Sequence, residues 1–443
     1  MYKTVALHTL GCKLNYSETS TIAKQFAQKG LKILDFGEKA DIFVLNTCTV
    51  TENADKECRQ LIRSVLRQNP ETFVVVTGCY AQLQPGEIST IEGVDLVLGS
   101  NEKFKLLDYL GDVDTHDLSC LGKKSKTEIY VSPLDSLDAL GEAFSADTDS
   151  RTRAFLKIQD GCDYNCSFCT IPLARGKSRS LSLSSVLDNA KKIIDSGYKE
   201  IVLTGVNTGD YKFSDEEKNY KLIDLLYELD KLEIERIRIS SIEPNLLTDE
   251  IIALVKSSEK LCNHFHIPLQ SGDSEILKLM KRRYNLELYR DLIYKLNEEI
   301  SDVGIGVDVI VGFPGEKEEN FNNTYKFLDS LPISYLHVFT YSERKNTFAV
   351  TLPGNVDIRD RKIRSQVLRN LSAKKRFEFY SKHIGNEMSV LFEGRKNGTI
   401  EGWTGNYIRV KTGYFEGIHN SINLVKLLDT NGAKAVSGIP ILN

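Results

Sequence analysis

The sequence lacks a long apolar run, a signal peptide and a strong charge of one sign. No stretch approaches the eighteen apolar residues that a membrane-spanning helix needs. The first residues, Met1-Tyr-Lys-Thr-Val5, begin a strand-like segment and not the apolar core of a signal peptide. With 41% apolar and 27% charged residues, the composition is that of an ordinary globular protein. We therefore expect a cytoplasmic protein with no membrane partner.

The net charge of −4 is unevenly distributed along the 443 residues. Between Gly354 and Asn443 there are 15 Lys and Arg against 8 Asp and Glu, a local charge of +7, so residues 1–353 carry −11. A basic C-terminal end on an acidic body predicts a polyanionic partner there, and a solvated charged face is the alternative. The length is too great for one core and predicts two to four domains.

The nine cysteines do not predict a disulfide scaffold, because a cytoplasmic protein meets a reducing environment. Cys162, Cys166 and Cys169 lie within eight residues in the pattern C-x3-C-x2-C. Two or three intervening residues let successive sulfurs turn toward one soft metal centre. Three thiolates on a four-iron cluster leave one iron open to a small molecule, which favours a catalytic site.

The first 110 residues alternate between strand and helix patterns, which predicts an open parallel sheet of Rossmann-like type covered on both faces. The overall fold class is therefore α/β with several domains. The expected strands are Thr4–Leu10, Ile42–Leu45, Phe73–Thr77 and Leu96–Leu98, and the expected helices are Ser17–Lys29, Glu52–Gln68 and one that starts at Glu102.

Cys12, Cys48 and Cys79 each come just after one of these strands. The carboxyl ends of parallel strands share one edge of the sheet, so these three thiols are able to converge. The alternative is three buried free cysteines, a common environment for this residue. For Cys58, Cys120 and Cys262 we expect no metal.

Residues 132–150 are rich in Ser, Asp, Ala and Gly and predict a linker. Residues 154–341 then repeat the strand and helix alternation six times, which predicts a partial (β/α)6 barrel with its site at the carboxyl ends of the strands. The expected strands are Phe155–Ile158, Ile201–Leu203, Arg236–Ile239, His264–Pro268, Gly306–Val311 and Tyr335–Thr340, and the helices are Leu183–Ser196, Tyr220–Lys231, Asp249–Ser257, Glu287–Glu299 and Glu318–Leu328.

After a helix at Ile358–Lys382, five short β-rich segments predict a small β-barrel. Its positive charge and its residues Trp403, Tyr407 and Tyr414 are typical of RNA binding, and a structural cap is the alternative. The expected domains are 1–131, the linker 132–150, 151–375 and 376–443. The expected strands are Met388–Phe392, Thr399–Trp403, Tyr407–Lys411, Ile422–Leu428 and Ala433–Val436.

The three-cysteine loop, with Phe168 before its last cysteine, resembles the cluster loop of the radical S-adenosylmethionine enzymes. Glycine-rich or polar segments after the later strands match the segments with which that superfamily holds S-adenosylmethionine. The resemblance implies cofactor contacts at Phe168, Gly205, Asn207, Ser241, Glu243, Gln270, Asp308 and Val311.

The order of a three-cysteine domain, a radical barrel and a terminal module of the TRAM type resembles the methylthiotransferases over essentially the whole chain. The motifs at 171–180, 266–272 and 308–316 fit that family. The resemblance implies that Cys12, Cys48 and Cys79 hold a second, auxiliary [4Fe–4S] cluster. One departure is Asn346, which stands where the family has glycine; Asn tolerates a left-handed backbone better than most residues.

The segments 10–18 and 77–82 are similar to the branch that acts on N6-threonylcarbamoyladenosine beside the tRNA anticodon. The alternatives are the branches for isopentenyladenosine in tRNA or for an aspartate of a ribosomal protein, and a non-enzymatic, metal-dependent RNA-binding protein.

The implied reaction replaces the C2 hydrogen of the adenine by a methylthio group. The first cluster and S-adenosylmethionine supply a 5′-deoxyadenosyl radical, the auxiliary cluster carries the sulfur, and a second S-adenosylmethionine methylates it. An external electron donor is expected, the sulfur source is open, and DNA is not an expected partner. His264 and His266 are expected as packed core residues. The expected RNA contacts are Arg175, Arg179, Arg409 and Lys411.

Overall fold

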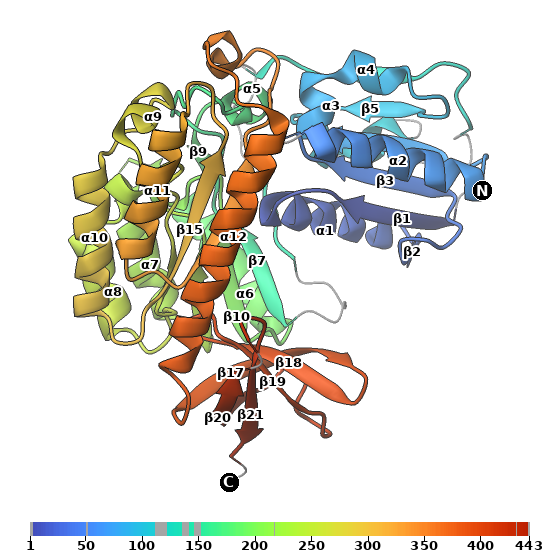
Figure 1. The fold of residues 1–443 in the computed structure, drawn as a ribbon. Helices are drawn as coiled ribbons and strands as arrows, with labels where there is room; N and C mark the ends of the chain where they lie inside the picture. The colour runs from blue at the N-terminus through green and yellow to red at the C-terminus, as the bar shows by residue number, and fades with distance from the viewer. Residues whose placement is uncertain are drawn as a thin grey trace.

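The computed structural model describes residues 3–49, 52–110, 122–134, 141–145, 152–216, 218–430 and 432–441. An N-terminal sheet domain lies against one side of a central α/β body, and a small β-barrel lies at one end of that body (Figure 1). Cys120 lies outside the described residues. So do residues 135–140 and 146–151, which belong to the expected linker or adjoin it.

The N-terminal sheet has six strands, all parallel, in the order β2-β1-β3-β4-β5-β6. The expected parallel sheet is confirmed, while the short strands β2 and β6 at its two ends were not predicted. The elements are β1 (Thr4–Thr9), α1 (Lys13–Gln28), β2 (Lys32–Leu34), β3 (Ile42–Thr47), α2 (Glu52–Gln68), β4 (Phe73–Gly78), α3 (Cys79–Leu83), α4 (Pro85–Ser89), β5 (Leu96–Leu98), the 3-10 helix η1 (Lys103–Tyr109) and β6 (Glu128–Tyr130).

Both faces of this sheet are covered, so its central strands are apolar without alternation. Ile22 and Phe26 of α1 pack on one face. Cys58 and Ile62 of α2 pack on the other. Cys58 is fully buried, as the sequence predicted.

The central body contains six parallel strands in two sheets, β13-β10-β7 and β14-β15-β16. Isolated bridges from Ile237 to Leu261 and from Ser241 to His266 join the sheets, so the predicted partial barrel is confirmed. Its elements are β7 (Arg153–Lys157), α6 (Leu183–Asp195), β10 (Glu200–Thr204), α7 (Leu222–Asp230), β13 (Arg236–Ile239), α8 (Asp249–Ser257), β14 (His264–His266), α9 (Ser274–Leu279), α10 (Leu286–Glu299), β15 (Gly304–Val311), α11 (Glu318–Ser330), β16 (Tyr335–Thr340) and α12 (Ile358–Ser381).

The described part of the predicted linker is not a free loop. The Ser145 N–H donates to the Phe155 carbonyl at 3.0 Å, and the Lys157 N–H donates to the Ala143 carbonyl at 3.0 Å. These bonds cover the outer edge of β7.

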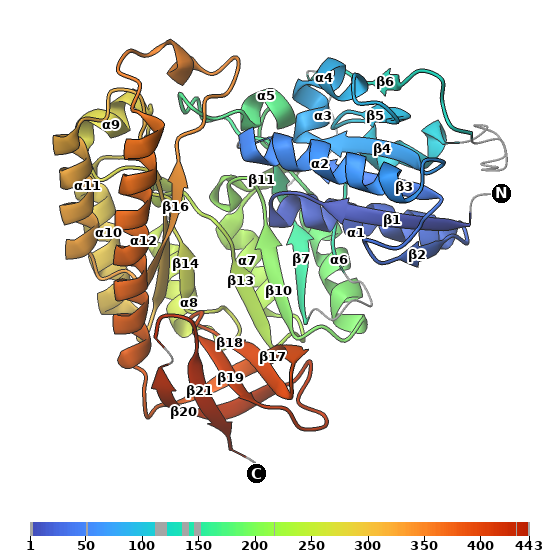
Figure 2. The ribbon, with the colours of Figure 1, turned by 45° about the vertical axis from the view of Figure 1, so that its right-hand side comes forward.

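The C-terminal module is a closed barrel of five strands in the order β17-β18-β19-β21-β20, as predicted. It lies at the amino ends of the strands of the partial barrel, below β7, β10 and β13 in Figure 2. Arg236 donates to the carbonyls of Trp403 and Ser389, and Arg238 donates to the carbonyls of Thr404 and Gly405. The strands are β17 (Glu387–Lys396), β18 (Thr399–Thr404), β19 (Arg409–Gly413), β20 (Ile422–Thr430) and β21 (Val436–Pro440).

Among the described residues, no helix combines the length and the apolar character that crossing a bilayer requires.

A buried ion pair anchors the module. The Arg238 Nε atom donates to Glu200 Oε1 at 2.7 Å, and both side chains are inaccessible to solvent. We expect Glu200→Gln to lower the free energy of unfolding by about 3–5 kcal/mol, because it leaves the Arg238 charge buried without its partner. The exposed pair of Lys199 and Glu235 provides the control: Glu235→Gln should cost less than about 1 kcal/mol in the same urea titration. Equal effects of the two substitutions would contradict the assignment.

The same pair predicts a pH dependence. Burial alone would raise the pKa of Glu200, but the charge of Arg238 lowers it from 4.5 to about 2. The stabilisation is therefore complete above about pH 4.5 and is lost as the pH falls toward 2. The difference in stability between the wild type and Glu200→Gln should shrink between about pH 5 and pH 3, measured by urea unfolding at each pH. A constant difference over this range would contradict the shifted pKa.

Candidate active site

The three-thiol loop leaves β7 through the two-residue strand β8 (Gln159–Asp160), at the carboxyl end of the barrel. Gly161 has φ +70°, and a Cβ atom there would lie 2.0 Å from the Lys177 carbonyl oxygen. Only glycine fits this position, and the Cys162 N–H then donates to the Gly176 carbonyl at 3.1 Å. The loop is thus folded back on the segment that follows it.

The three thiols of this loop accept hydrogen bonds from nitrogen donors. The backbone N–H groups of Tyr164 and Ile171 donate to the Sγ atoms of Cys162 and Cys169 at 3.4 and 3.5 Å. Arg282 donates through Nη1 to Cys166 Sγ at 3.0 Å. Such donors stabilise thiolates bound to an iron–sulfur cluster.

Burial raises the pKa of the Cys162 thiol to about 11 and that of Cys169 to about 12. Without a metal these groups stay protonated, whereas a bound metal removes the proton. Three cysteines in one loop, each with a sulfur that accepts from a nitrogen donor, therefore fit a cluster held by three thiolates.

Arg282 was not found from the sequence. Its side chain is 3% exposed and forms an ion pair with Glu243 while it contacts Cys166. Glu243 is therefore held beside the cluster loop, in the segment that follows β13. The basic run that precedes Tyr284 was the only local signal for this role.

Gln159 connects the cluster loop to the loop after β10. Its Oε1 atom accepts from the Asn207 N–H at 3.0 Å, and its Nε2 atom donates to the Gly161 carbonyl at 2.8 Å. A Cβ at Gly205 would approach Gln159 Oε1 to 2.9 Å. Asn207 is 4% exposed, and neither of its side-chain polar atoms has a partner within the described part of the chain. A buried amide without a partner fits a polar ligand such as S-adenosylmethionine.

The other predicted cofactor residues lie at different depths. The side chain of Val311 is fully buried in the core between the strands and helices, so its backbone is the part available to a cofactor, and this contact stays a prediction. Gln270 has φ +70°, a strained backbone of the kind found at functional sites. Phe168 packs edge-on against Phe313. Ser241 is half-buried and its carbonyl accepts from Thr208, and Asp308 is bonded to His266 inside the barrel.

Cys12, Cys48 and Cys79 follow β1, β3 and β4, which are neighbours in the sheet. A Cβ at Gly11, where φ is +107°, would lie 2.9 Å from Cys48 Sγ, so this glycine lets the two loops approach. Cys12 precedes the first residue of α1, and Cys79 is the first residue of α3. The second set of three thiols therefore meets at one edge of the sheet, as predicted.

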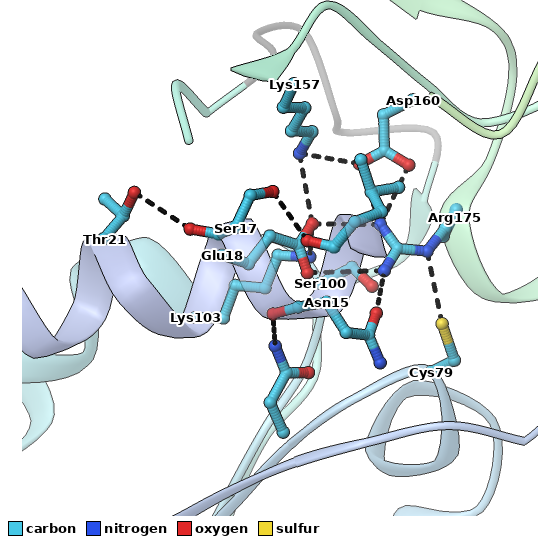
Figure 3. A network of polar contacts seen from close by, with 12 residues as sticks. Asn15, Ser17, Glu18, Thr21, Cys79, Ser100, Lys103, Lys157, Asp160 and Arg175 are labelled. Atoms are coloured by element: carbon cyan, nitrogen blue, oxygen red, sulfur yellow. Dashed lines mark hydrogen bonds and ion pairs between the residues drawn. The ribbon is translucent and has the colours of Figure 1, made fainter. Parts of the chain in front are cut away.

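Arg175 requires a correction, because it was expected on RNA and is 2% exposed. It comes six residues after Cys169 and turns inward, where its Nε atom donates to Cys79 Sγ at 3.2 Å (Figure 3). Its guanidinium also donates to Glu18 and Asp160 at 3.0 and 2.9 Å. Arg175 thus contacts one set of thiols from a position six residues after the other set.

Lys103 and Lys157 complete this buried network, with Nζ atoms 2.6 and 3.1 Å from Glu18 Oε1. Lys157 also pairs with Asp160 at 2.9 Å. Three cations thus face two carboxylates. Burial would raise the pKa of Glu18 and Asp160, but the charge of Arg175 and both lysines brings it well below the usual range. Burial raises the pKa of the Cys79 thiol, and the third positive charge would stabilise a thiolate there once a metal is bound.

Arg344 joins the N-terminal domain to the barrel near Cys48. It donates to Asp55 Oδ2 at 2.6 Å and to the hydroxyl of Thr49. Its loop includes Asn346 at φ +66°, so Asn adopts the left-handed conformation expected at this position.

The remaining predicted RNA contacts lie apart. Arg179 is half-buried and donates to the Arg175 carbonyl at 3.1 Å. Arg409 pairs with Glu401, and Lys411 is exposed, both on the C-terminal barrel at the end opposite the thiols. Their contact with RNA stays a prediction.

A partial parallel barrel with a three-thiol loop after its first strand defines a radical S-adenosylmethionine enzyme. The model of the radical SAM superfamily matches residues 156–328. The model of uncharacterized protein family UPF0004 matches residues 4–99, which cover the second set of thiols.

Full-length relatives narrow this class. The chain is 42% identical to the threonylcarbamoyladenosine tRNA methylthiotransferase MtaB of Bacillus subtilis (strain 168), over 96% of this chain and 94% of that one. It is 40% identical to the protein of the same name from Aquifex aeolicus (strain VF5), over 96% and 99%. It is 33% identical to the tRNA-2-methylthio-N(6)-dimethylallyladenosine synthase of Clostridium tetani, over 98% and 94%. The chain belongs to the radical S-adenosylmethionine methylthiotransferase family and is an enzyme of that family.

A solved structure agrees on the fold alone. The radical S-adenosylmethionine methyltransferase TsrM from Kitasatospora setae superposes with a TM-score of 0.55 at 16% identity, over 77% of this chain and 75% of that one.

If each set of three thiols holds its own cluster, substitution of either set should remove the iron of that cluster alone. The reconstituted wild type should hold about eight irons per chain, and the triple variant Cys12→Ala/Cys48→Ala/Cys79→Ala about four. That variant should still cleave S-adenosylmethionine under reduction, whereas the triple alanine variant of Cys162, Cys166 and Cys169 should not. Anaerobic iron and sulfide analysis measures the content, and Cys58→Ala is the control because its thiol is buried in the helix core. Eight irons in the first variant would contradict the auxiliary site.

Proposed function

We propose that this enzyme adds a methylthio group to C2 of N6-threonylcarbamoyladenosine beside the anticodon of tRNA. The observation that carries the proposal is the meeting of two sets of three thiols at one domain junction, where Arg175 follows one set and contacts Cys79 of the other. Four relatives at 33–42% identity that bear the threonylcarbamoyladenosine name support the substrate. The relatives with the dimethylallyladenosine name stand at 32–33%.

The protein groups position the cofactors and insulate them. Cys162, Cys166 and Cys169 would hold the radical-generating cluster, and Cys12, Cys48 and Cys79 would hold the second one. When bound, the clusters and S-adenosylmethionine supply the radical and the sulfur that substitution of an unactivated C–H bond requires. Asn207 is placed to bind the cosubstrate, and Arg282 and Arg175 neutralise thiolate charge. Arg344 closes the junction beside Cys48.

The division into 1–131, 132–150, 151–375 and 376–443 is part of the proposal, as are an external electron donor and a cytoplasmic location. The partner is the anticodon stem-loop of a tRNA, and the exposed cations of the C-terminal barrel, such as Lys411, are suited to its phosphates.

Mass spectrometry of tRNA nucleosides tests this function. Deletion of the gene should abolish the 2-methylthio form of threonylcarbamoyladenosine and leave its unthiolated precursor in its place. Complementation with the wild-type gene should restore the nucleoside, and complementation with Cys162→Ala should not, because the cluster loop loses one ligand. The 2-methylthio form of isopentenyladenosine serves as the internal control and should be unchanged. Loss of that nucleoside in place of the first would assign the enzyme to the other substrate.

A further inference from the structure

The inside of the radical barrel is polar and is not used by the cluster ligands. Along each strand, alternate residues belong to the core under the helices, for example Val307 and Val309 of β15 or Leu336 of β16. The residues between them point inward, because side chains alternate across a strand. This interior surface carries Arg153, Glu200, Arg236, Arg238, His264, His266, Asp308, Tyr335 and His337.

The inner end of this lumen is closed by the C-terminal barrel. Tyr407 stacks on Trp403 at 4.5 Å between ring centroids and on His264 at 4.6 Å. His264 also bonds to the Tyr335 hydroxyl at 2.9 Å. A molecule that enters the lumen from the cluster side therefore meets a floor of rings.

A polar group stands between this floor and the carboxyl ends of the strands. His266 Nε2 and Asp308 Oδ1 are 2.8 Å apart, and His337 lies opposite Asp308 in the pairing of β15 with β16. The three side chains offer polar atoms within 4.8 Å of one another. His337 is exposed, so this group is accessible to a ligand.

Lys13 faces this group from the N-terminal domain. It is the first residue of α1, and Tyr16, one turn later, packs edge-on against the inward-pointing Phe155 at 5.6 Å. The charge of Lys13 contributes, after burial, to the lowered pKa of both His264 and His337. Within the described chain no hydrogen bond or ion pair is formed by its ammonium group, although Lys13 as a residue is exposed. Burial of the ammonium group against the barrel, together with the charges of Arg153 and Arg238, lowers its pKa, while Tyr407 and Glu200 favour the charged form.

Among the described residues the cations of the lumen outnumber its carboxylates: Lys13, Arg153, Arg236 and Arg238 face Glu200, Glu393 and Asp308, so the lumen is suited to an anion. Arg238 is paired with Glu200, and Arg153 with Glu393. The carboxylate of the polar group itself is Asp308, which is bonded to His266. Lys13 is thus a cation without a counterion in a partly desolvated space, where an ion pair is stronger than in water.

We propose that Lys13, together with the imidazoles of His337 and of His266, which Asp308 holds in place, binds the carboxylate of the threonylcarbamoyl group and thereby selects this nucleoside over adenosines with an uncharged N6 substituent. The inference rests on the proposed function. The N6 substituent is attached to C6, which is separated from the reacting C2 by a single ring nitrogen. Lys13 directly follows Cys12, so a base whose C2 faces the auxiliary thiols has its N6 group within the reach of a lysine side chain.

The test uses the reconstituted full-length enzyme and two anticodon stem-loops, one with threonylcarbamoyladenosine and one with its neutral carboxamide. Binding is measured by fluorescence anisotropy under anaerobic conditions, and kcat/KM by product formation. The wild type should favour the carboxylate at least about tenfold in both, because a charge-assisted hydrogen bond is lost in the amide. Lys13→Gln should lose about 10- to 100-fold on the carboxylate and nothing on the carboxamide. Lys13→Arg should keep the preference.

Iron content and reductive cleavage of S-adenosylmethionine should be unchanged in both Lys13 variants. Lys29→Gln, at the exposed C-terminal cap of the same helix and therefore at the end away from the thiols, is the control. Equal losses of Lys13→Gln on both stem-loops would assign Lys13 to an RNA phosphate or to the cluster loop and overturn the proposal, as would no loss at all. A wild type that modifies an isopentenyladenosine stem-loop and not the threonylcarbamoyl one would overturn the proposed function itself. The two failures are therefore distinguishable.

Discussion

The buried ion network at the domain junction is the constraint on which the active site depends. Glu18 and Lys103 come from the N-terminal domain, and Lys157, Asp160 and Arg175 come from the barrel. Each ion costs several kcal/mol to desolvate, and only a full set of partners offsets that cost. The two domains therefore fit together in one arrangement, and that arrangement puts Arg175 against Cys79. Because one positive charge is left over, the junction is also suited to a negatively charged cluster.

The sequence predicted most of the fold, because the apolar strands and the amphipathic helices between them are local patterns. The predictions were wrong where the buried side chains are polar or charged. Helix α1 begins at Lys13 and not at Ser17, since its first two turns bury Asn15 and Glu18 for the network. Cys162, Cys166 and Cys169 were found because their spacing is local, and Cys12, Cys48 and Cys79 because each follows a predicted strand. Gln159, Arg282 and the inward turn of Arg175 were missed or misjudged, because their roles come from contacts with residues 39 to 160 positions away.

The aromatic residues of the C-terminal barrel also have a role that their sequence did not predict. Trp403 and Tyr407 have the composition of a base-stacking surface, yet they stack on each other, and Tyr407 stacks on His264. The structural-cap alternative therefore holds for these two rings, which seal the amino end of the radical barrel. Any contact with RNA is left to the outer cations of the module, among them Lys411. A sequence pattern predicts which residue types such a module carries. It does not predict which face of the module is covered by the neighbouring domain.

The loop after β1 joins chemistry and selection in adjacent residues. Cys12 is placed to hold the auxiliary cluster, and the next residue, Lys13, opens α1 toward the barrel lumen. Glu18, five residues after Lys13 on α1, is held in the buried network. Because the two residues share one helix, the network also fixes the position of Lys13 relative to the thiols. Lys13 would then bind a charged group of the substrate at a fixed distance from the reacting carbon. A substitution at Lys13 would therefore change the substrate specificity without moving the cluster ligands.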